Sequence, residues 1–131
     1  MSNEINADLF FQARSIDQIV TECHGRSVAA GWYTDPQTGA PLQRNVPEML
    51  ALIHSEVSEA LEGYRKGLND THLKSRKMIE VELADTLIRI ADLAGYLKLD
   101  LGGAYAEKLV YNATREDHKL ENRKLAGGKA F

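Results

Sequence analysis

Apolar positions follow a helical period along most of this chain. In residues 6–30 they recur at steps of four, three, four and three, which places them on one face of an α-helix. These positions are Leu9, Ala13, Ile16, Val20 and Cys23. All three prolines lie between Pro36 and Pro47, so the rest of the chain lacks the strongest helix breaker. The pattern predicts an all-α protein.

A second helix is expected from Asn45 to about Gly67. Asn45 followed by Glu48, with Pro47 in the first turn, is typical of a capped helix start. The expected buried face of this helix consists of Met49, Leu50, Ile53, Val57, Ala60, Leu61 and Tyr64. Residues 68–75 are rich in turn formers and predict a connection.

The third expected helix, about residues 76–97, is apolar nearly all round. Its polar positions form only a narrow strip, made of Glu82, Asp85, Arg89 and Asp92. A helix of this kind must be covered on nearly all sides, which three further helices of one chain would hardly achieve. We therefore expect self-association into a homodimer or a homotetramer.

The fourth expected helix runs from about Leu101 to Lys119, with Asp100 as its cap. Lys108, Asn112 and Arg115 are spaced by four and three, so this helix would carry them on one face. We expect a single domain over residues 1–131, with a tail at about 122–131 that is either flexible or folded over a neighbouring surface.

An irregular stretch at residues 31–44 separates the first two helices. It contains Trp32 and Tyr33, which would either stack on a nucleobase or close the end of the helical domain; the sequence leaves both interpretations open. His24, beside the first apolar stripe, is interpreted as a core-edge or surface residue and not as a ligand.

Composition and charge bear on the partners and the location of the protein. The net charge of −3 favours neither nucleic acid nor an anionic membrane as a partner. Cys23 is the only cysteine, no apolar run has the length of a membrane span, and the first residues show no signal-peptide pattern. We expect a cytoplasmic location, no membrane partner and no stable binding of nucleic acid.

Two acidic pairs carry the candidate chemistry. Glu56 and Glu59 are three residues apart, as are Glu82 and Asp85, so each pair occupies one helix face. Each pair alone is typical of a solvated surface. Together on neighbouring helices they would gather four carboxylates, whose mutual repulsion a hard divalent cation such as Mg²⁺ relieves.

The compound pattern is Glu56-x-x-Glu59, then Glu82-x-x-Asp85, then Lys108-x-x-x-Asn112-x-x-Arg115. Over residues 45–115 it resembles the MazG-type all-α nucleoside triphosphate pyrophosphohydrolases. The resemblance implies a four-helix MazG-like bundle that assembles into a homo-oligomer, commonly a dimer of dimers. It also implies Mg²⁺, with Mn²⁺ as an alternative, and hydrolysis of (deoxy)nucleoside triphosphates between the α- and β-phosphates, as in cleaning of the nucleotide pool.

The resemblance also assigns roles by position. The metal ligands would be Glu56, Glu59, Glu82 and Asp85. Among these four acids we expect Glu59, and after it Glu56, to serve as the catalytic base. The resemblance implies that Lys108 and Arg115 hold phosphates. Asn112 would contact the nucleoside. The family often has an aromatic residue where this chain has Arg89, so Trp32 and Tyr33 are the candidates for contact with the base.

Two other classes of protein compete with this interpretation. A di-iron carboxylate bundle needs Glu-x-x-His on two helices, and this chain has Glu59 and Asp85 where the histidines would stand. A non-catalytic helical module that binds nucleotides and acts as a regulator remains the alternative function.

Overall fold

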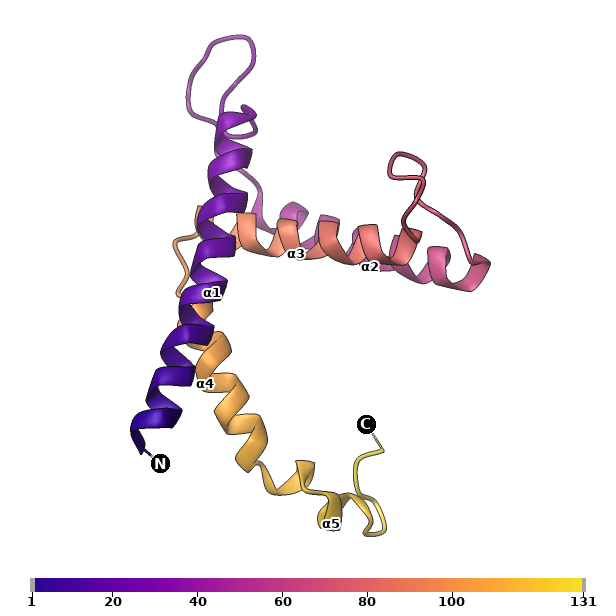
Figure 1. The fold of residues 1–131 in the computed structure, drawn as a ribbon. Coiled ribbons are helices and arrows are strands. Elements are labelled where there is room, and N and C mark those ends of the chain that lie inside the picture. Colours follow the sequence, from indigo (N-terminus) through magenta and orange to yellow (C-terminus); the bar gives the residue numbers. More distant parts are fainter. Residues whose placement is uncertain (1, 131) are drawn as a thin grey trace. The chain divides into compact units, whose positions relative to one another are not determined.

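The computed structural model describes the backbone of residues 2–130 and the side chains of residues 7–130. Helices make up 68% of the chain (Figure 1). Within residues 2–130 there is no β-strand, only the isolated bridges between Thr34 and Pro41 and between Asn69 and Lys77. The predicted all-α class is confirmed.

The helices follow the predicted order with one difference near the C-terminus. They are α1 (Ser2–Ala29), α2 (Val46–Lys66), α3 (Met78–Tyr96), α4 (Leu101–Thr114), a 3₁₀ turn (Glu116–His118) and α5 (Leu120–Arg123). The prediction that the fourth helix reaches Lys119 is wrong. Arg115 has extended backbone angles, φ −65° and ψ 126°, so it follows α4 and does not share a helix face with Lys108 and Asn112.

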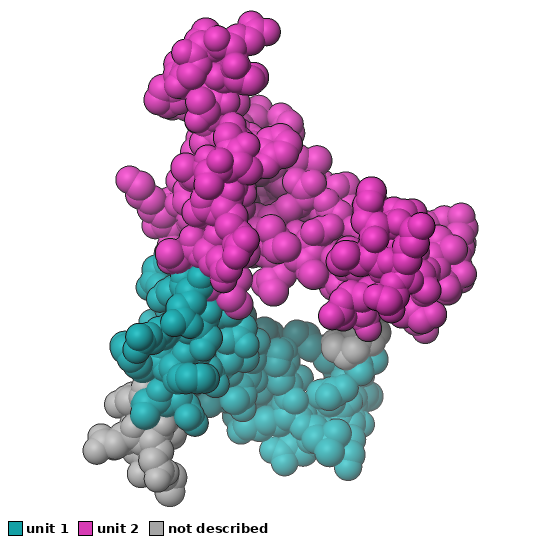
Figure 2. Space-filling model, turned by 45° about the horizontal axis from the view of Figure 1, so that its top comes forward, with its two compact units in different colours: residues 1–18, 100–131 teal, residues 19–99 magenta. Residues whose placement is uncertain are grey.

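The chain divides into two compact units, coloured separately in Figure 2. Unit 1 comprises residues 1–18 and 100–131, and unit 2 comprises residues 19–99. Each unit is described by itself. Both acidic pairs belong to unit 2, whereas Lys108, Asn112 and Arg115 belong to unit 1.

Local caps determine where α2 begins and ends. The Asn45 side chain accepts a hydrogen bond of 3.0 Å from the backbone N–H of Glu48, as the sequence predicted. At the other end Gly67 adopts φ 63° and ψ 32°, a left-handed conformation that glycine tolerates best, and its N–H bonds to the Tyr64 carbonyl. These two ends set the length of the helix that carries Glu56 and Glu59.

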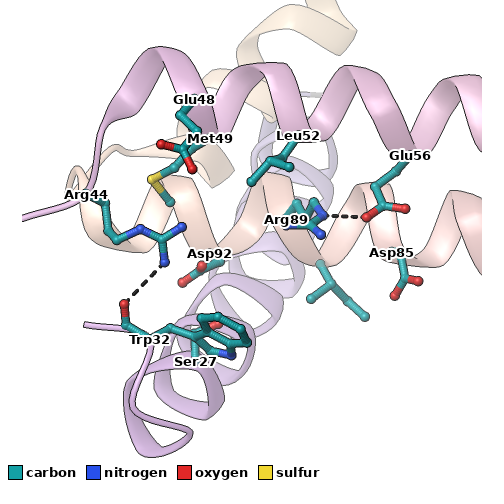
Figure 3. Close-up of a pocket in the computed structure, with 11 residues that line it drawn as sticks. Ser27, Trp32, Arg44, Glu48, Met49, Leu52, Glu56, Asp85, Arg89 and Asp92 are labelled. Atoms are coloured by element: carbon teal, nitrogen blue, oxygen red, sulfur yellow. Dashed lines mark hydrogen bonds and ion pairs between the residues drawn. The ribbon is translucent and has the colours of Figure 1, made fainter. Parts of the chain in front are cut away.

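Helices α2 and α3 pack side by side in unit 2, and they run antiparallel (Figures 1 and 3). At Gly63 the helices come so close that a Cβ atom would lie 2.8 Å from Cβ of Met78. A larger residue at position 63 would push the helices apart. The contact therefore helps to set the distance at which the acids of α2 and α3 face each other.

The expected buried face of α2 is only partly covered. Met49 and Ala60 are buried, whereas the other apolar positions are half-buried or exposed. The exposed ones are Leu50, Val57, Leu61 and Tyr64. On α3 the exposed large apolar residues are Leu83, Leu87 and Ile88. In the single chain, α3 covers only the side of α2 that carries Met49, Glu56, Ala60 and Gly63, so the rest of the expected buried face stays uncovered.

In unit 1, α4 lies against α1 through a glycine. Asp100 caps α4 by accepting a hydrogen bond of 2.9 Å from the N–H of Gly103. A Cβ atom at Gly102 would collide with the carbonyl of Ala13 and the carboxylate of Asp17. Gly102, which weakens the first helical turn, thus permits the close packing of two helices.

Among the described residues, no helix combines the length and the apolar character that crossing a bilayer requires.

Candidate metal and nucleotide site

Three carboxylates from α2 and α3 meet in unit 2. Carboxylate oxygens of Glu56, Glu59 and Glu82 all lie within 4.8 Å of one another. Glu56 and Glu82 are buried, each with 8% of its surface exposed, while Glu59 is exposed. The three-residue spacing places Glu56 and Glu59 on successive turns of α2, and α3 brings Glu82 to them from the opposite side.

The fourth expected ligand, Asp85, lies one helical turn further along α3 and is half-buried. Burial raises its pKa, and the negative charges of Glu56 and Asp70 raise it further against the opposing effect of Arg89. Asp70 is a buried acid in the connection between α2 and α3, where it accepts hydrogen bonds from the N–H groups of His72 and Leu73. Negative charge thus extends beyond the three clustered carboxylates.

The closely spaced carboxyl groups of the cluster change one another's pKa values. Burial, followed by the proximity of Glu56 and Glu59, raises the pKa of Glu82 to about 7. For Glu56, burial also opposes ionisation, but contacts with Arg89 and with the neighbouring carboxyl groups outweigh it and lower the pKa. Near neutral pH Glu56 is therefore ionised, whereas Glu82 is partly protonated.

Arg89 supplies one positive charge to the cluster. Its Nε donates a hydrogen bond of 2.6 Å to Oε1 of Glu56, across the interface between α3 and α2 (Figure 3). The Arg89 side chain is 42% exposed and that of Glu56 only 11%. The sequence pattern placed Arg89 on the acidic strip of α3, yet gave no indication of this partner on α2.

A cavity of about 520 Å³ opens next to the cluster, entirely within unit 2. Its lining includes Glu56, Asp85 and Arg89 at one end and Trp32 and Arg44 at the other (Figure 3). Glu48, Met49 and Leu52 of α2 line the wall between the two ends. The volume falls in the range of small-molecule sites, and Glu56, the member of the carboxylate cluster that lines it, lies at one end.

The loop between α1 and α2 brings Trp32 to this cavity. The backbone N–H of Arg44 donates a hydrogen bond of 3.0 Å to the Tyr96 hydroxyl on α3, and the Arg44 guanidinium donates one of 3.2 Å to the Trp32 carbonyl. The Trp32 side chain remains 63% exposed. An exposed indole at the rim of a cavity is available for stacking.

Tyr33, the other aromatic candidate, has a different environment. It is half-buried, its hydroxyl bonds to Asp92, and its ring lies 5.1 Å from that of Tyr96. His24 contacts the same Asp92 oxygen at 2.9 Å and meets the edge of the Tyr33 ring. These contacts hold the loop against α1 and α3, so the geometry gives Tyr33 and His24 packing partners, and Tyr33 is not among the residues that line the cavity.

Of the candidates in unit 1, Lys108 and Arg115 flank one aromatic ring. Lys108 Nζ lies 4.6 Å from the centre of the Tyr111 ring, and the Arg115 guanidinium carbon lies 5.6 Å from it. Arg115 also forms a two-point ion pair with Asp117, at 2.9 and 2.7 Å. Asn112 Oδ1 is buried and, among the described residues, has no hydrogen-bond partner. An acceptor of this kind fits a ligand that supplies a donor.

The donor set in unit 2 suits a hard cation. Only carboxylate oxygens converge there, with no described histidine or cysteine in the cluster, and oxygen ligands are the ones that Mg²⁺ and Mn²⁺ prefer. The charge repulsion that raises the pKa of Glu82 is also what a divalent cation removes. Both metals stay predictions, and the residues present fit them.

Comparison with models of protein families, with curated proteins and with solved structures finds no significant match to this chain. The assignment of a function therefore depends on the residues and on the geometry of the site.

Proposed function

We propose that this protein is a Mg²⁺-dependent nucleoside triphosphate pyrophosphohydrolase of the MazG type. The observation that carries the proposal is the convergence of Glu56, Glu59 and Glu82 within 4.8 Å, at the edge of a cavity of about 520 Å³. A triphosphate with its cation needs a carboxylate cluster, and its nucleoside needs an adjoining cavity.

The four acids would have two kinds of role, binding of the cation and acceptance of a proton. Glu56 and Glu82, buried on facing helices, would hold the cation, and Asp85 would complete the set from the next turn of α3. When bound, Mg²⁺ lowers the pKa of a coordinated water and offsets charge on the phosphates. Glu59 is exposed, so it can accept the proton of the attacking water and pass it to solvent. Attack at the α-phosphorus would release the nucleoside monophosphate and pyrophosphate.

Trp32 and Arg44 line the far end of the cavity, where the nucleoside would bind. The exposed indole supports stacking with a base, and the resemblance assigns phosphate contacts to Lys108 and Arg115 and a nucleoside contact to Asn112. These three roles, and that of Tyr33 as a base contact, remain predictions.

The same resemblance supports a four-helix bundle that forms a homo-oligomer. The four exposed large apolar residues of α2 recur at steps of seven, four and three, so they form one stripe along the helix. They are Leu50, Val57, Leu61 and Tyr64. A second copy of the chain would cover this α2 stripe, in a homodimer or in a tetramer of two dimers.

The test is release of pyrophosphate from a panel of ribo-, deoxy- and modified nucleoside triphosphates in Mg²⁺. Glu59→Ala should lose at least about a hundredfold in kcat, the typical contribution of a positioned base. Glu62→Ala is the matched control, because Glu62 lies on the same helix and forms ion pairs only with Arg65 and Lys66 among the described residues. It should retain the wild-type rate.

Folded wild-type protein that binds triphosphates without turnover would overturn the hydrolase and favour the non-catalytic nucleotide-binding module. Equal rates for Glu59→Ala and Glu62→Ala would remove Glu59 from the mechanism.

A further inference from the structure

Arg89 and the expected cation have the same partner. The Arg89 guanidinium lies 2.6 Å from Oε1 of Glu56, one of the three clustered carboxylates. A cation coordinated by the same carboxylate would meet a positively charged group in direct contact with its own ligand. The two positive charges therefore compete for Glu56.

The two partners differ in how easily they can separate. Glu56 is buried, so its carboxylate needs a positive partner at all times. Arg89 is 42% exposed and lies on the cavity wall, so its guanidinium can turn into the cavity at low desolvation cost. Its Nη1 and Nη2 atoms donate no hydrogen bond to the part of the chain that is described, which leaves them available to another acceptor.

We infer that Arg89 is a displaceable counter-ion: it neutralises Glu56 in the empty site, leaves when the cation binds, and then holds a phosphate of the nucleotide that accompanies this cation. The inference rests on the proposed function, because the displaced guanidinium needs an anionic ligand. It makes the cation–triphosphate complex the preferred ligand over the free cation. A free cation must break the ion pair without compensation, whereas the complex supplies phosphate oxygens as a new, charge-assisted partner for Arg89.

The first experiment measures free Mn²⁺ binding without nucleotide, by the electron paramagnetic resonance signal of the unbound ion. Arg89→Met should bind Mn²⁺ about tenfold more tightly than the wild type, as loss of a charge-assisted competitor predicts. Arg89→Lys keeps the charge but not the guanidinium, so its Mn²⁺ affinity should lie between those of the wild type and Arg89→Met. Arg65→Met is the matched control: it removes the same charge from an exposed pair with Glu62 on α2 and should leave Mn²⁺ affinity unchanged.

The second experiment titrates each protein with the preformed complex of Mg²⁺ and inorganic triphosphate, followed by calorimetry. Here the order should reverse, and Arg89→Met should bind the complex about tenfold more weakly than the wild type. A merely structural role would shift both affinities in the same direction, because a distorted site binds both ligands less well.

The outcomes separate this inference from the proposed function. Equal Mn²⁺ affinities of Arg89→Met and Arg65→Met, with hydrolysis intact, would overturn the counter-ion role alone. A tenfold difference in Mn²⁺ affinity without hydrolysis of any triphosphate would overturn the hydrolase but keep the competition at Glu56. If no protein in the series binds Mn²⁺, both proposals fail.

Discussion

The hydroxyl of Tyr33 donates a hydrogen bond of 2.9 Å to Oδ1 of Asp92 and so ties the loop after α1 to helix α3. Burial and this bond to a carboxylate raise the pKa of Tyr33 well above its usual range, so the hydroxyl stays protonated and keeps its role as donor. The neighbouring residue, Trp32, lines the cavity, and we expect this tie to help hold it there.

Tyr33→Phe should lower the free energy of unfolding by about 1–2 kcal/mol, because the half-buried Asp92 loses a donor. The loop should also loosen. Trp32 is the only tryptophan, so quenching of its fluorescence by acrylamide reports directly on that change. Tyr64→Phe, at a side chain that is 71% exposed, is the control. Equal urea midpoints and equal quenching for the two variants would contradict a positioning role for Tyr33.

The carboxylate cluster should make the metal-free protein less stable as the pH rises. Because burial and the neighbouring acids raise the pKa of Glu82 to about 7 in the folded state, unfolding favours its ionisation. The stability that Glu82 contributes is fully present below the pKa that this residue has in the unfolded chain, about 4.3 for a glutamate. It is lost as the pH rises to about 7, at a cost on the order of 3 kcal/mol.

Urea unfolding in EDTA between pH 5 and pH 8 measures this effect. The wild type should lose stability over that range, and Glu82→Gln should flatten the profile, whereas Glu62→Gln should not. Glu56 acts in the opposite sense: contacts with Arg89 and the neighbouring carboxyl groups lower its pKa, so the stability it contributes is lost only in acid. A pH profile that Glu82→Gln leaves unchanged would argue against the crowding of these carboxylates.

The α2 stripe should mediate self-association. Leu61→Glu places a charge in the middle of that stripe, at a side chain that is 59% exposed in the single chain. It should therefore shift the protein toward the monomer without unfolding it, as measured by light scattering after size exclusion. Gln37→Glu adds the same charge in an exposed loop and should not change the oligomer. A monomeric wild type would refute the proposed assembly.

Short-range signals predicted much of this fold. The cap formed by Asn45 and the stop at Gly67 depend on residues within one helical turn, so the bounds of α2 could be predicted from sequence. The period of the apolar positions gave the direction of each face, but not which element would cover it. For this reason the sequence alone does not say which positions of the face, such as Leu61 and Tyr64, the single chain leaves exposed.

Contacts between elements were harder to predict. The pair formed by Arg89 and Glu56 depends on the register of α3 against α2, which the close approach at Gly63 helps to set. Asp70 lies in a connection without a period, and its place beside Asp85 has no sequence signal. The spacing did indicate that Glu56, Glu59, Glu82 and Asp85 belong together. Two acidic pairs with a spacing of three residues, one pair on each helix, can meet along a single helix interface.

If these carboxylates serve cleavage between the α- and β-phosphates, ³¹P NMR of a mixture of nucleoside triphosphates incubated with the wild-type protein and Mg²⁺ tests this most directly. Pyrophosphate and nucleoside monophosphate should appear in equal amounts, and EDTA should abolish both. Release of orthophosphate with a nucleoside diphosphate, or the absence of any product from folded protein, would contradict this role of the carboxylates.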